Sequence, residues 1–283
     1  MRFGRLNDRL VLLGETHALD VHKMSGGRFA ADPDLAFEDW DSLVDWAQDQ
    51  SPDDGIEYAA EQLGAPFLRP PQIFAIGLNY VDHAKESGVT VPSSPTVFTK
   101  FATCLTGPYS EVVLPTDGVD WEVELVVVLK KQAERVSVED AWSYVAGLMV
   151  GQDLSERATQ LAGPVPQFSL GKSFPGFGPI GPALVTLDEV ESPDDLAITC
   201  SLDGEVLQAA RTSQMVFSVP ELISRISHIC PLLPGDLIFT GTPPGVGMGR
   251  DPKRYLPAGG TLTSEIKGIG KLVNTMTAAS VAS

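Results

Sequence analysis

The segment from Val119 to Leu129, VDWEVELVVVL, constrains the fold of this chain more than any other stretch. Its last four residues are apolar and mostly β-branched, which predicts a strand buried on both faces. Because side chains alternate along a strand, Glu122 and Glu124 share one face. Two ionised carboxylates buried side by side repel each other and lose hydration, so the pattern requires either a proton or a cation there.

A third carboxylate favours the cation. Asp153 follows YVAGLMVGQ, a second apolar stretch that leads into polar sequence. Three oxygen ligands without a nearby histidine or cysteine suit Mg²⁺ or Mn²⁺ better than Zn²⁺. The alternative is an edge strand whose two glutamates face water, which is the commoner setting for an isolated pair with this spacing. Asp120 belongs to the same face but lies at the mouth of the strand, so it is not assigned as a ligand.

Strand patterns dominate the chain beyond residue 68. They include QIFAIGL, PTVFTKF, AITCSLDG, DLIFTG and TLTSEIKG, separated by loops rich in proline and glycine. Two helices are expected between them, one over 137–147 that ends at Gly147 and one over 218–229 with capping-box spacing at its start. Strands and helices do not alternate strictly, so the pattern predicts an α+β fold.

The first 68 residues have a different pattern. RFGRL and RLVLLG flank the turn-forming pair Asn7-Asp8, which predicts a hairpin. A helix is expected over 37–48, with one apolar face. The proline-rich segment APFLRPPQ then predicts a boundary near Leu68, between a small N-terminal domain (1–68) and a metal-binding catalytic domain (69–283).

The charge balance excludes some partners. The chain has 37 acidic and 20 basic residues, a formal net charge of −17, so its surface repels nucleic acid phosphates and anionic lipid headgroups. No apolar run reaches membrane-spanning length, and the first residues lack the apolar core of a signal peptide. Cys104, Cys200 and Cys230 form no CxxC pattern and are expected to be reduced thiols. These features predict a cytoplasmic protein that binds neither nucleic acid nor membranes.

Other polar clusters suggest a substrate site. His83 and Glu86, three residues apart, would be neighbours on a helical turn, where the carboxylate would orient the imidazole. QDLSERATQ supplies Arg157 and Gln160, and SLGKSF supplies Lys172, which are groups suited to an anionic substrate. Taken singly, each is more often a solvated surface residue. FTGTPPGVGMG is not followed by a helical pattern and LGKSF lacks the upstream glycine of a phosphate loop, so neither indicates a nucleotide site.

In this order, the clusters resemble the fumarylacetoacetate hydrolase family. The matching stretches lie between residues 70 and 275: GLNYVDHAKESG, VDWEVELVVVL, YVAGLMVGQDLSERATQ, SLGKSFPGFGPIGP, LLPGDLIFTGTPPGVG and SEIKGIGKLVN. The resemblance implies a mixed β-sheet rolled into a β-roll that holds a divalent metal, preceded by a small N-terminal α/β domain. It also implies a homodimer.

The family motifs imply a role for each matching residue. The implied metal ligands are Glu122, Glu124 and Asp153. His83 and Glu86 match the dyad that handles water and protons, and Lys172 matches the group near the developing negative charge. The implied substrate-binding residues are Arg157, Gln160, Thr242, Asn79, Tyr80 and Lys100.

Three positions depart from the family pattern. Lys130 stands where glycine is usual, and Pro175 and Gly260 stand where aspartate is common. None of them is an implied ligand or part of the dyad. The departures therefore bear on substrate choice and loop shape.

The expected activity is metal-dependent hydrolysis of a carbon-carbon bond in a 1,3-dicarbonyl compound, such as an acylpyruvate or diketo acid. The metal would act as a Lewis acid while His83 activates water. One alternative is oxaloacetate decarboxylation, or tautomerisation or hydration of a 2-oxo acid, with the same ligands. Another is a non-catalytic binding protein stabilised by the metal. The first two predict a small dicarbonyl or 2-oxo acid as substrate.

Overall fold

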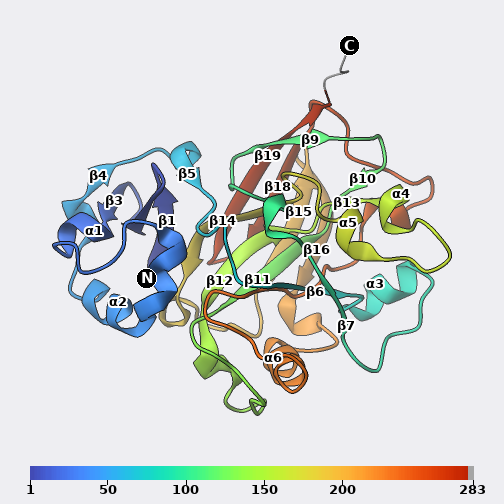
Figure 1. Ribbon diagram of the computed structural model, residues 1–283. Helices are drawn as coiled ribbons and strands as arrows, with labels where there is room; N and C mark the ends of the chain where they lie inside the picture. Colours follow the sequence, from blue (N-terminus) through green and yellow to red (C-terminus); the bar gives the residue numbers. More distant parts are fainter. Residues whose placement is uncertain (280–283) are drawn as a thin grey trace.

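The apolar run behind Glu124 lies at the centre of the molecule, in strand β11 (Val123–Leu129) (Figure 1). All seven residues of β11 are buried. The strand pairs antiparallel with β12 (Val145–Gln152) on one side and with β17 (Leu237–Phe239) on the other. The prediction of a strand buried on both faces is confirmed, and the edge-strand alternative is wrong.

The computed structural model describes residues 1–279, and its largest sheet has twelve strands. The sheet is mixed, because β17 and β6 run parallel whereas most other pairs are antiparallel. Its order is β4 (Ile56–Glu57), β3 (His17–Asp20), β2 (Arg9–Leu13), β1 (Arg2–Leu6), β14 (Gly178–Val185), β12, β11, β17, β6 (Ile73–Gly77) and β7 (Thr96–Thr99), with β5 (Leu63–Gly64) beside β1 and β8 (Leu105–Thr106) beside β14.

A second, five-stranded sheet packs against the first. Its order is β16 (Glu205–Arg211), β15 (Ala197–Leu202), β18 (Thr261–Ile266), β19 (Gly270–Ala278) and β9 (Glu111–Leu114). Alternate residues of β15 are buried, as expected for a strand with one face on the core, and they join β11 in one apolar cluster. A short pair, β10 (Val119–Asp120) with β13 (Ser155–Glu156), lies at the mouth of the core.

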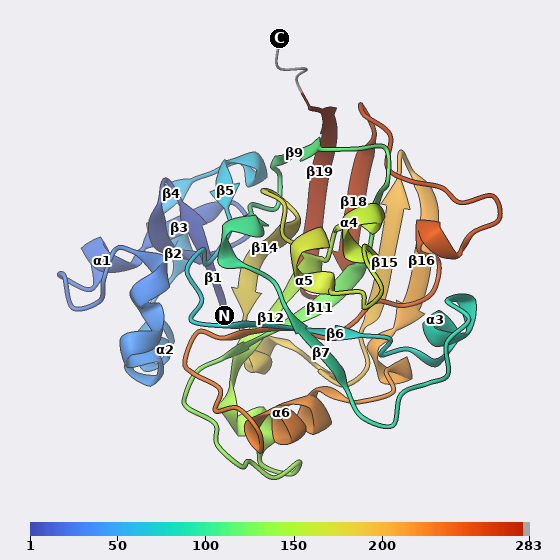
Figure 2. The ribbon, with the colours of Figure 1, turned by 45° about the vertical axis from the view of Figure 1, so that its right-hand side comes forward.

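Six short helices lie around the sheets in the described part of the chain (Figure 2). They are α1 (Val21–Met24), α2 (Trp40–Ala47), α3 (Val81–Glu86), α4 (Arg157–Gln160), α5 (Phe168–Gly171) and α6 (Val219–Ser227). The strands greatly outnumber them, so the α+β class with a mixed sheet is confirmed. The ordered path of the large sheet has two ends, β4 and β7, so the sheet does not close into a barrel within residues 1–279.

The N-terminal residues extend the central sheet. β1 and β2 form the expected hairpin, and Asn7 and Asp8 in its turn have positive φ angles of 51° and 59°. β1 also pairs with β14, so the N-terminal strands continue the sheet that contains β11 (Figure 1). Helix α2 buries Trp40, Leu43 and Ala47, in agreement with the apolar face expected over 37–48. The domain boundary near Leu68 stays a prediction.

One expected helix is absent and one is confirmed. Over 137–147 the structure has only a 3-10 turn, Ala141–Tyr144, followed by strand β12. The apolar residues after Tyr144 pair with β11 and β14, so sheet pairing overrides the local capping pattern. Gly147 permits close strand packing, because a Cβ there would lie 2.3 Å from the carbonyl oxygen of Val185. Helix α6 has the expected capping box, in which Glu221 Oε2 accepts from Ser218 N at 2.9 Å.

Candidate functional site

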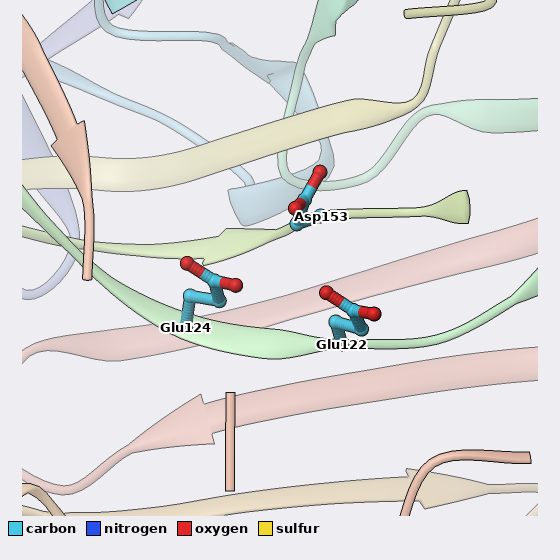
Figure 3. Close-up of side chains that lie close together, drawn as sticks. All are labelled: Glu122, Glu124 and Asp153. Atoms are coloured by element: carbon cyan, nitrogen blue, oxygen red, sulfur yellow. The ribbon is translucent and has the colours of Figure 1, made fainter. Parts of the chain in front are cut away.

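Three buried carboxylates meet where β11 begins and β12 ends. Glu122 precedes β11, Glu124 is its second residue, and Asp153 directly follows β12. Oxygen atoms of the three side chains lie within 4.8 Å of one another. Figure 3 shows Glu122 and Glu124 on the same side of their strand, facing Asp153. The shared face expected from alternation is therefore present, and it includes the third carboxylate.

Antiparallel pairing explains why Asp153 reaches this face. Val123 lies opposite Gln152 in the ladder, and the amide of Asp153 donates to the carbonyl of Glu122 at 2.9 Å. The last bond of the ladder therefore holds the two carboxylate-bearing segments together. The ladder brings together carboxylates that are 29 to 31 residues apart in the chain.

Two lysines neutralise part of this charge. Lys172 Nζ donates to Glu122 Oε2 at 2.7 Å, to Asp153 Oδ2 at 2.6 Å and to Ser155 Oγ at 2.8 Å. Lys100 Nζ donates to Asp153 Oδ1 at 2.7 Å and to two backbone carbonyls. Both ammonium groups are fully buried and bonded to protein. Lys100 thus lies behind Asp153, away from the cavity described below.

Arg157 forms a third cationic contact. Its guanidinium lies 2.8 Å from Glu122 Oε1 and donates to Gln160 Oε1 at 2.8 Å. Two further bonds, at 2.9 and 2.7 Å, run to Asp120 Oδ2. Asp120 also accepts from the backbone amides of Gly247 and Met248 at 2.7 and 2.9 Å. Asp120 was not predicted as a site residue, although its place on the carboxylate face was the sequence signal for this anchoring role.

Two of the three carboxylates form ion pairs with buried cations, and the third, Glu124, does not. Burial raises the pKa of Glu122, but Lys172, Arg157 and His83 outweigh it and lower that pKa to about 2. Burial, Asp153 and Glu122 raise the pKa of Glu124 well above its usual value. Glu124 accepts one hydrogen bond, from Gly241 N at 2.8 Å, and forms no ion pair with any residue of the described chain. A hard divalent cation bound to these oxygens would offset this charge, so the donor set fits Mg²⁺ or Mn²⁺.

The expected dyad is formed on helix α3. His83 Nδ1 lies 2.7 Å from Glu86 Oε1, and Glu86 Oε2 accepts from Gly245 N at 2.8 Å. Because the Glu86 carboxylate accepts from Nδ1, the lone pair of Nε2 is left for another partner. The amide of Gly245, in the glycine-rich loop after β17, therefore orients the Glu86 carboxylate. The carboxylate in turn orients the His83 imidazole.

A cavity of about 280 Å³ lies between His83 of the dyad and Glu122 of the carboxylate cluster, and both side chains line it. Its polar lining residues are His83, Glu122, Arg157, Gln160, Lys172, Thr242 and Ser87. Its apolar lining residues are Ile76, Leu78, Val89, Phe98, Leu161, Phe168 and Met248. The cavity can thus bind a charged chelating group through its polar side chains and enclose an apolar group with the others.

Asn79 is buried and bonded away from the cavity. It donates to the carbonyls of Phe217 and Thr240 at 3.0 and 2.7 Å and accepts from Phe217 N at 2.8 Å, so it joins three chain segments. Tyr80 is also buried, and its hydroxyl has no hydrogen-bond partner within residues 1–279. Burial and Glu124 raise the pKa of Tyr80, so it is a neutral group beside the carboxylates.

Comparison with known proteins identifies the family. Residues 72–277 match the model of the fumarylacetoacetate hydrolase C-terminal domain. The human protein named oxaloacetate tautomerase FAHD2A, mitochondrial, is 47% identical over 212 residues, which are 74% of this chain and 68% of that protein.

Solved structures extend the match to almost the whole chain. The structure of a Mycobacterium smegmatis protein described as an HpcE protein is 47% identical to this chain, with a TM-score of 0.94. The match covers 99% of this chain and 100% of that one. Maleylpyruvate hydrolase from Sphingobium sp. SYK-6, solved with manganese and pyruvate, is 25% identical with a TM-score of 0.82, covering 99% and 100%.

The relatives also correct one expectation. The matching human and cattle proteins are named as mitochondrial, so the predicted cytoplasmic location is wrong. Among residues 1–279, no helix is long and apolar enough to cross a bilayer. The family match over 72–277, the fold and the relatives agree with the resemblance drawn from the motifs. This chain belongs to the fumarylacetoacetate hydrolase family and is an enzyme of that family.

Proposed function

We propose that the chain is a divalent-metal-dependent tautomerase of 2-oxo acids that interconverts the keto and enol forms of oxaloacetate. The observation that carries the proposal is the cavity lined by both His83, which Glu86 orients, and Glu122, one of the three clustered carboxylates. The 47% identity to a protein named oxaloacetate tautomerase supports this reaction over the others hosted by the family.

Glu122, Glu124 and Asp153 would hold the cation, Mg²⁺ or Mn²⁺, through oxygen ligands. When bound, a divalent cation polarises the 2-oxo group and makes the adjacent C–H more acidic. Four buried carboxylates face three buried cations in this site. A divalent ion would therefore turn the summed charge of these seven buried groups from negative to positive, which suits the carboxylate of a 2-oxo acid.

His83 would carry the proton. Its Nε2, left free by the bond from Nδ1 to Glu86, removes a proton from the carbon next to the carbonyl and returns it to the enolate oxygen. The reaction is an isomerisation, so it consumes no water and needs no further reactant. Gln160 and Arg157 line the same cavity and would orient the anionic substrate, while Lys172 adds positive charge beside Glu122.

Hydrolysis of an acylpyruvate is the second candidate. The apolar wall of the cavity favours it, because seven apolar side chains enclose a hydrocarbon group better than the second carboxylate of oxaloacetate. In that reaction His83 would remove a proton from water as the water attacks the distal carbonyl. The metal ligands serve both reactions.

Product analysis separates the two candidates. Purified protein is incubated with oxaloacetate or acetylpyruvate in Mn²⁺ and then in excess EDTA, with Mn²⁺ alone as the control for spontaneous reactions. The proposal expects faster enol–ketone exchange of oxaloacetate by NMR, lost in EDTA, with acetylpyruvate intact. Conversion of acetylpyruvate to acetate and pyruvate would establish the second candidate, and no effect on either compound would contradict both.

Two expectations from the sequence remain proposals. The first is the division near Leu68, and the second is a homodimer. Light scattering would show a particle of twice the 30.2 kDa of one chain. A mass of 30.2 kDa at micromolar concentration would contradict the homodimer.

A further inference from the structure

The backbone at the start of β11 lacks a strand partner on one side. β10 ends at Asp120 and β11 begins at Val123, so the residues between them lie outside the ladder. On the side of β17, pairing covers only Val126 to Val128. Val123 is fully buried, and its N–H and C=O groups must still be bonded.

Two side chains take the place of the missing strand. Gln208 Oε1 accepts from Val123 N at 3.1 Å, and Thr242 Oγ1 donates to Val123 O at 2.9 Å. Gln208 Nε2 donates in turn to Thr242 Oγ1 at 2.8 Å and to Pro243 O at 2.7 Å. Val123, Gln208 and Thr242 therefore form a closed ring of hydrogen bonds, which satisfies both backbone groups of Val123.

A third side chain fixes the neighbouring amide. Gln152 Oε1 accepts from Glu122 N at 2.9 Å, and its Nε2 donates to Ser264 Oγ at 2.8 Å. Gln152 and Gln208 are 0% and 1% exposed, so water cannot replace either of them. The five-stranded sheet thus holds the backbone on both sides of Glu122. Gln208 on β16, with Thr242, holds the two peptide units between Glu122 and Glu124, and Ser264 on β18 holds, through Gln152, the unit before Glu122.

We propose that Gln208 and Thr242, together with Gln152, are positioning residues that set the spacing of the Glu122 and Glu124 carboxylates for the metal. A metal site requires its ligands to be held to within about 0.5 Å, and the ladder bonds this segment on the β12 side only. The inference rests on the metal site of the proposed function. The hydrogen bonds of the Thr242 hydroxyl run to protein groups. Its role in this proposal is therefore to position the metal ligands and not to contact the substrate.

Gln208→Met tests the proposal with metal affinity as the readout. Methionine keeps the volume of the side chain and removes both halves of the amide. The matched control is Asn274→Leu, which likewise replaces an amide by an apolar group of similar shape, because Asn274 is an equally buried amide in the same sheet that bonds Gly107 O and Ser110 O instead. Both variants are expected to melt at a lower temperature than the wild type. Only Gln208→Met should bind Mn²⁺ about 10 to 100 times more weakly in calorimetric titration.

Substitutions of Thr242 are a second test of the proposal, which remains informative if Gln208→Met fails to fold. Thr242→Val should lose Mn²⁺ affinity, and Thr242→Ser, which keeps the hydroxyl, should retain it. Because Gln208 and Thr242 act in one ring, the loss in Gln208→Met/Thr242→Val should be smaller than the sum of the single losses. Mn²⁺ affinity within twofold of the wild type in Thr242→Val, or in a folded Gln208→Met, would overturn the proposal.

These experiments distinguish a failure of the positioning role from a failure of the proposed function. A wild type that binds Mn²⁺ without acting on oxaloacetate would contradict the function, and the variants would still decide the positioning role. A wild type that acts on oxaloacetate, with variants that bind Mn²⁺ normally, would contradict the positioning role alone.

Discussion

At the scale of single residues, the three carboxylates differ in their surroundings. Glu122 is held by Lys172 and Arg157, Asp153 is held by two lysines, and Glu124 has only a backbone amide. A carboxylate buried without a cation is costly unless it is protonated or an ion binds. Glu124 is therefore the residue that most directly indicates a metal.

This asymmetry predicts opposite effects of two conservative changes on the metal-free protein. Glu122→Gln should lower the free energy of unfolding by about 3 kcal/mol, because it leaves Lys172 and Arg157 short of a partner. Glu124→Gln should raise it by about 1 kcal/mol, because it removes an uncompensated charge while its oxygen still accepts from Gly241 N. Urea unfolding in EDTA measures both, and a change of the same sign in the two variants would count against the charge assignment.

The dyad makes a separate prediction about turnover. His83→Ala should lower kcat about a hundredfold, because the proton acceptor is lost, while Mn²⁺ affinity stays at the wild-type value. Glu86→Gln should have a smaller effect, since the imidazole keeps its place but loses the carboxylate that orients it. His228→Ala is the control, because His228 bonds Ser224 O at the end of α6, outside the cavity. Unchanged kcat in His83→Ala would rule out the proposed role.

At the scale of elements, local patterns predicted some structures well. The Asn7-Asp8 hairpin and the capping box of α6 depend on residues within three or four positions, and both are present. The same reasoning failed over 137–147, where capping signals were outweighed by pairing of β12 with two distant strands. Gln208 was missed for a related reason, because its partner Val123 is 85 residues away and no local pattern links them.

The capping box of α6 permits a test of local stability. Ser218→Ala should cost about 1 kcal/mol, because the Ser218 hydroxyl accepts from Glu221 N at the helix start. The melting temperature should fall by about 2–4 °C, measured by circular dichroism. Ser218→Asp, which keeps an acceptor, is the matched control. An unchanged melting temperature in Ser218→Ala would show that the cap contributes nothing.

The turn before β17 should make stability depend on pH. Burial raises the pKa of Asp236 to about 6 from its usual 3.8, although Leu233 N and Gln72 donate to its Oδ2. A raised pKa means that the folded state binds the proton more tightly. The stability contributed by this group is therefore fully present below pH 3.8 and is lost as the pH rises through about 6.

Asp236→Asn should remove this contribution. From pH 4.5 to pH 7.5, the free energy of unfolding of the wild type is expected to fall relative to that of Asp236→Asn. The other carboxylates titrate in both proteins and cancel in the difference. Urea unfolding at the two pH values measures the shift, and a difference independent of pH would show that Asp236 does not titrate in this range.

At the scale of the whole molecule, the site depends on contacts between distant segments. The sequence predicted the shared face of Glu122 and Glu124 from alternation and singled out Asp153 and the His83–Glu86 pair from local patterns, and the resemblance implied their roles. It could not place Asp120 under Arg157, or Gln152 and Gln208 behind the ligands, because these contacts depend on how the two sheets pack. Asn79 and Lys100 matched substrate positions by motif, but their side chains bond protein groups outside the cavity.

The central claim is that Glu122, Glu124 and Asp153 bind a divalent cation. Calorimetric titration of metal-free protein with Mn²⁺ tests it most directly, with wild type and Glu124→Gln compared under the same conditions. The account predicts one Mn²⁺ per chain in the wild type and an affinity at least about a hundredfold lower in the variant, since Glu124 would be a direct ligand. Equal affinity in the two proteins, or no binding by the wild type, would contradict it.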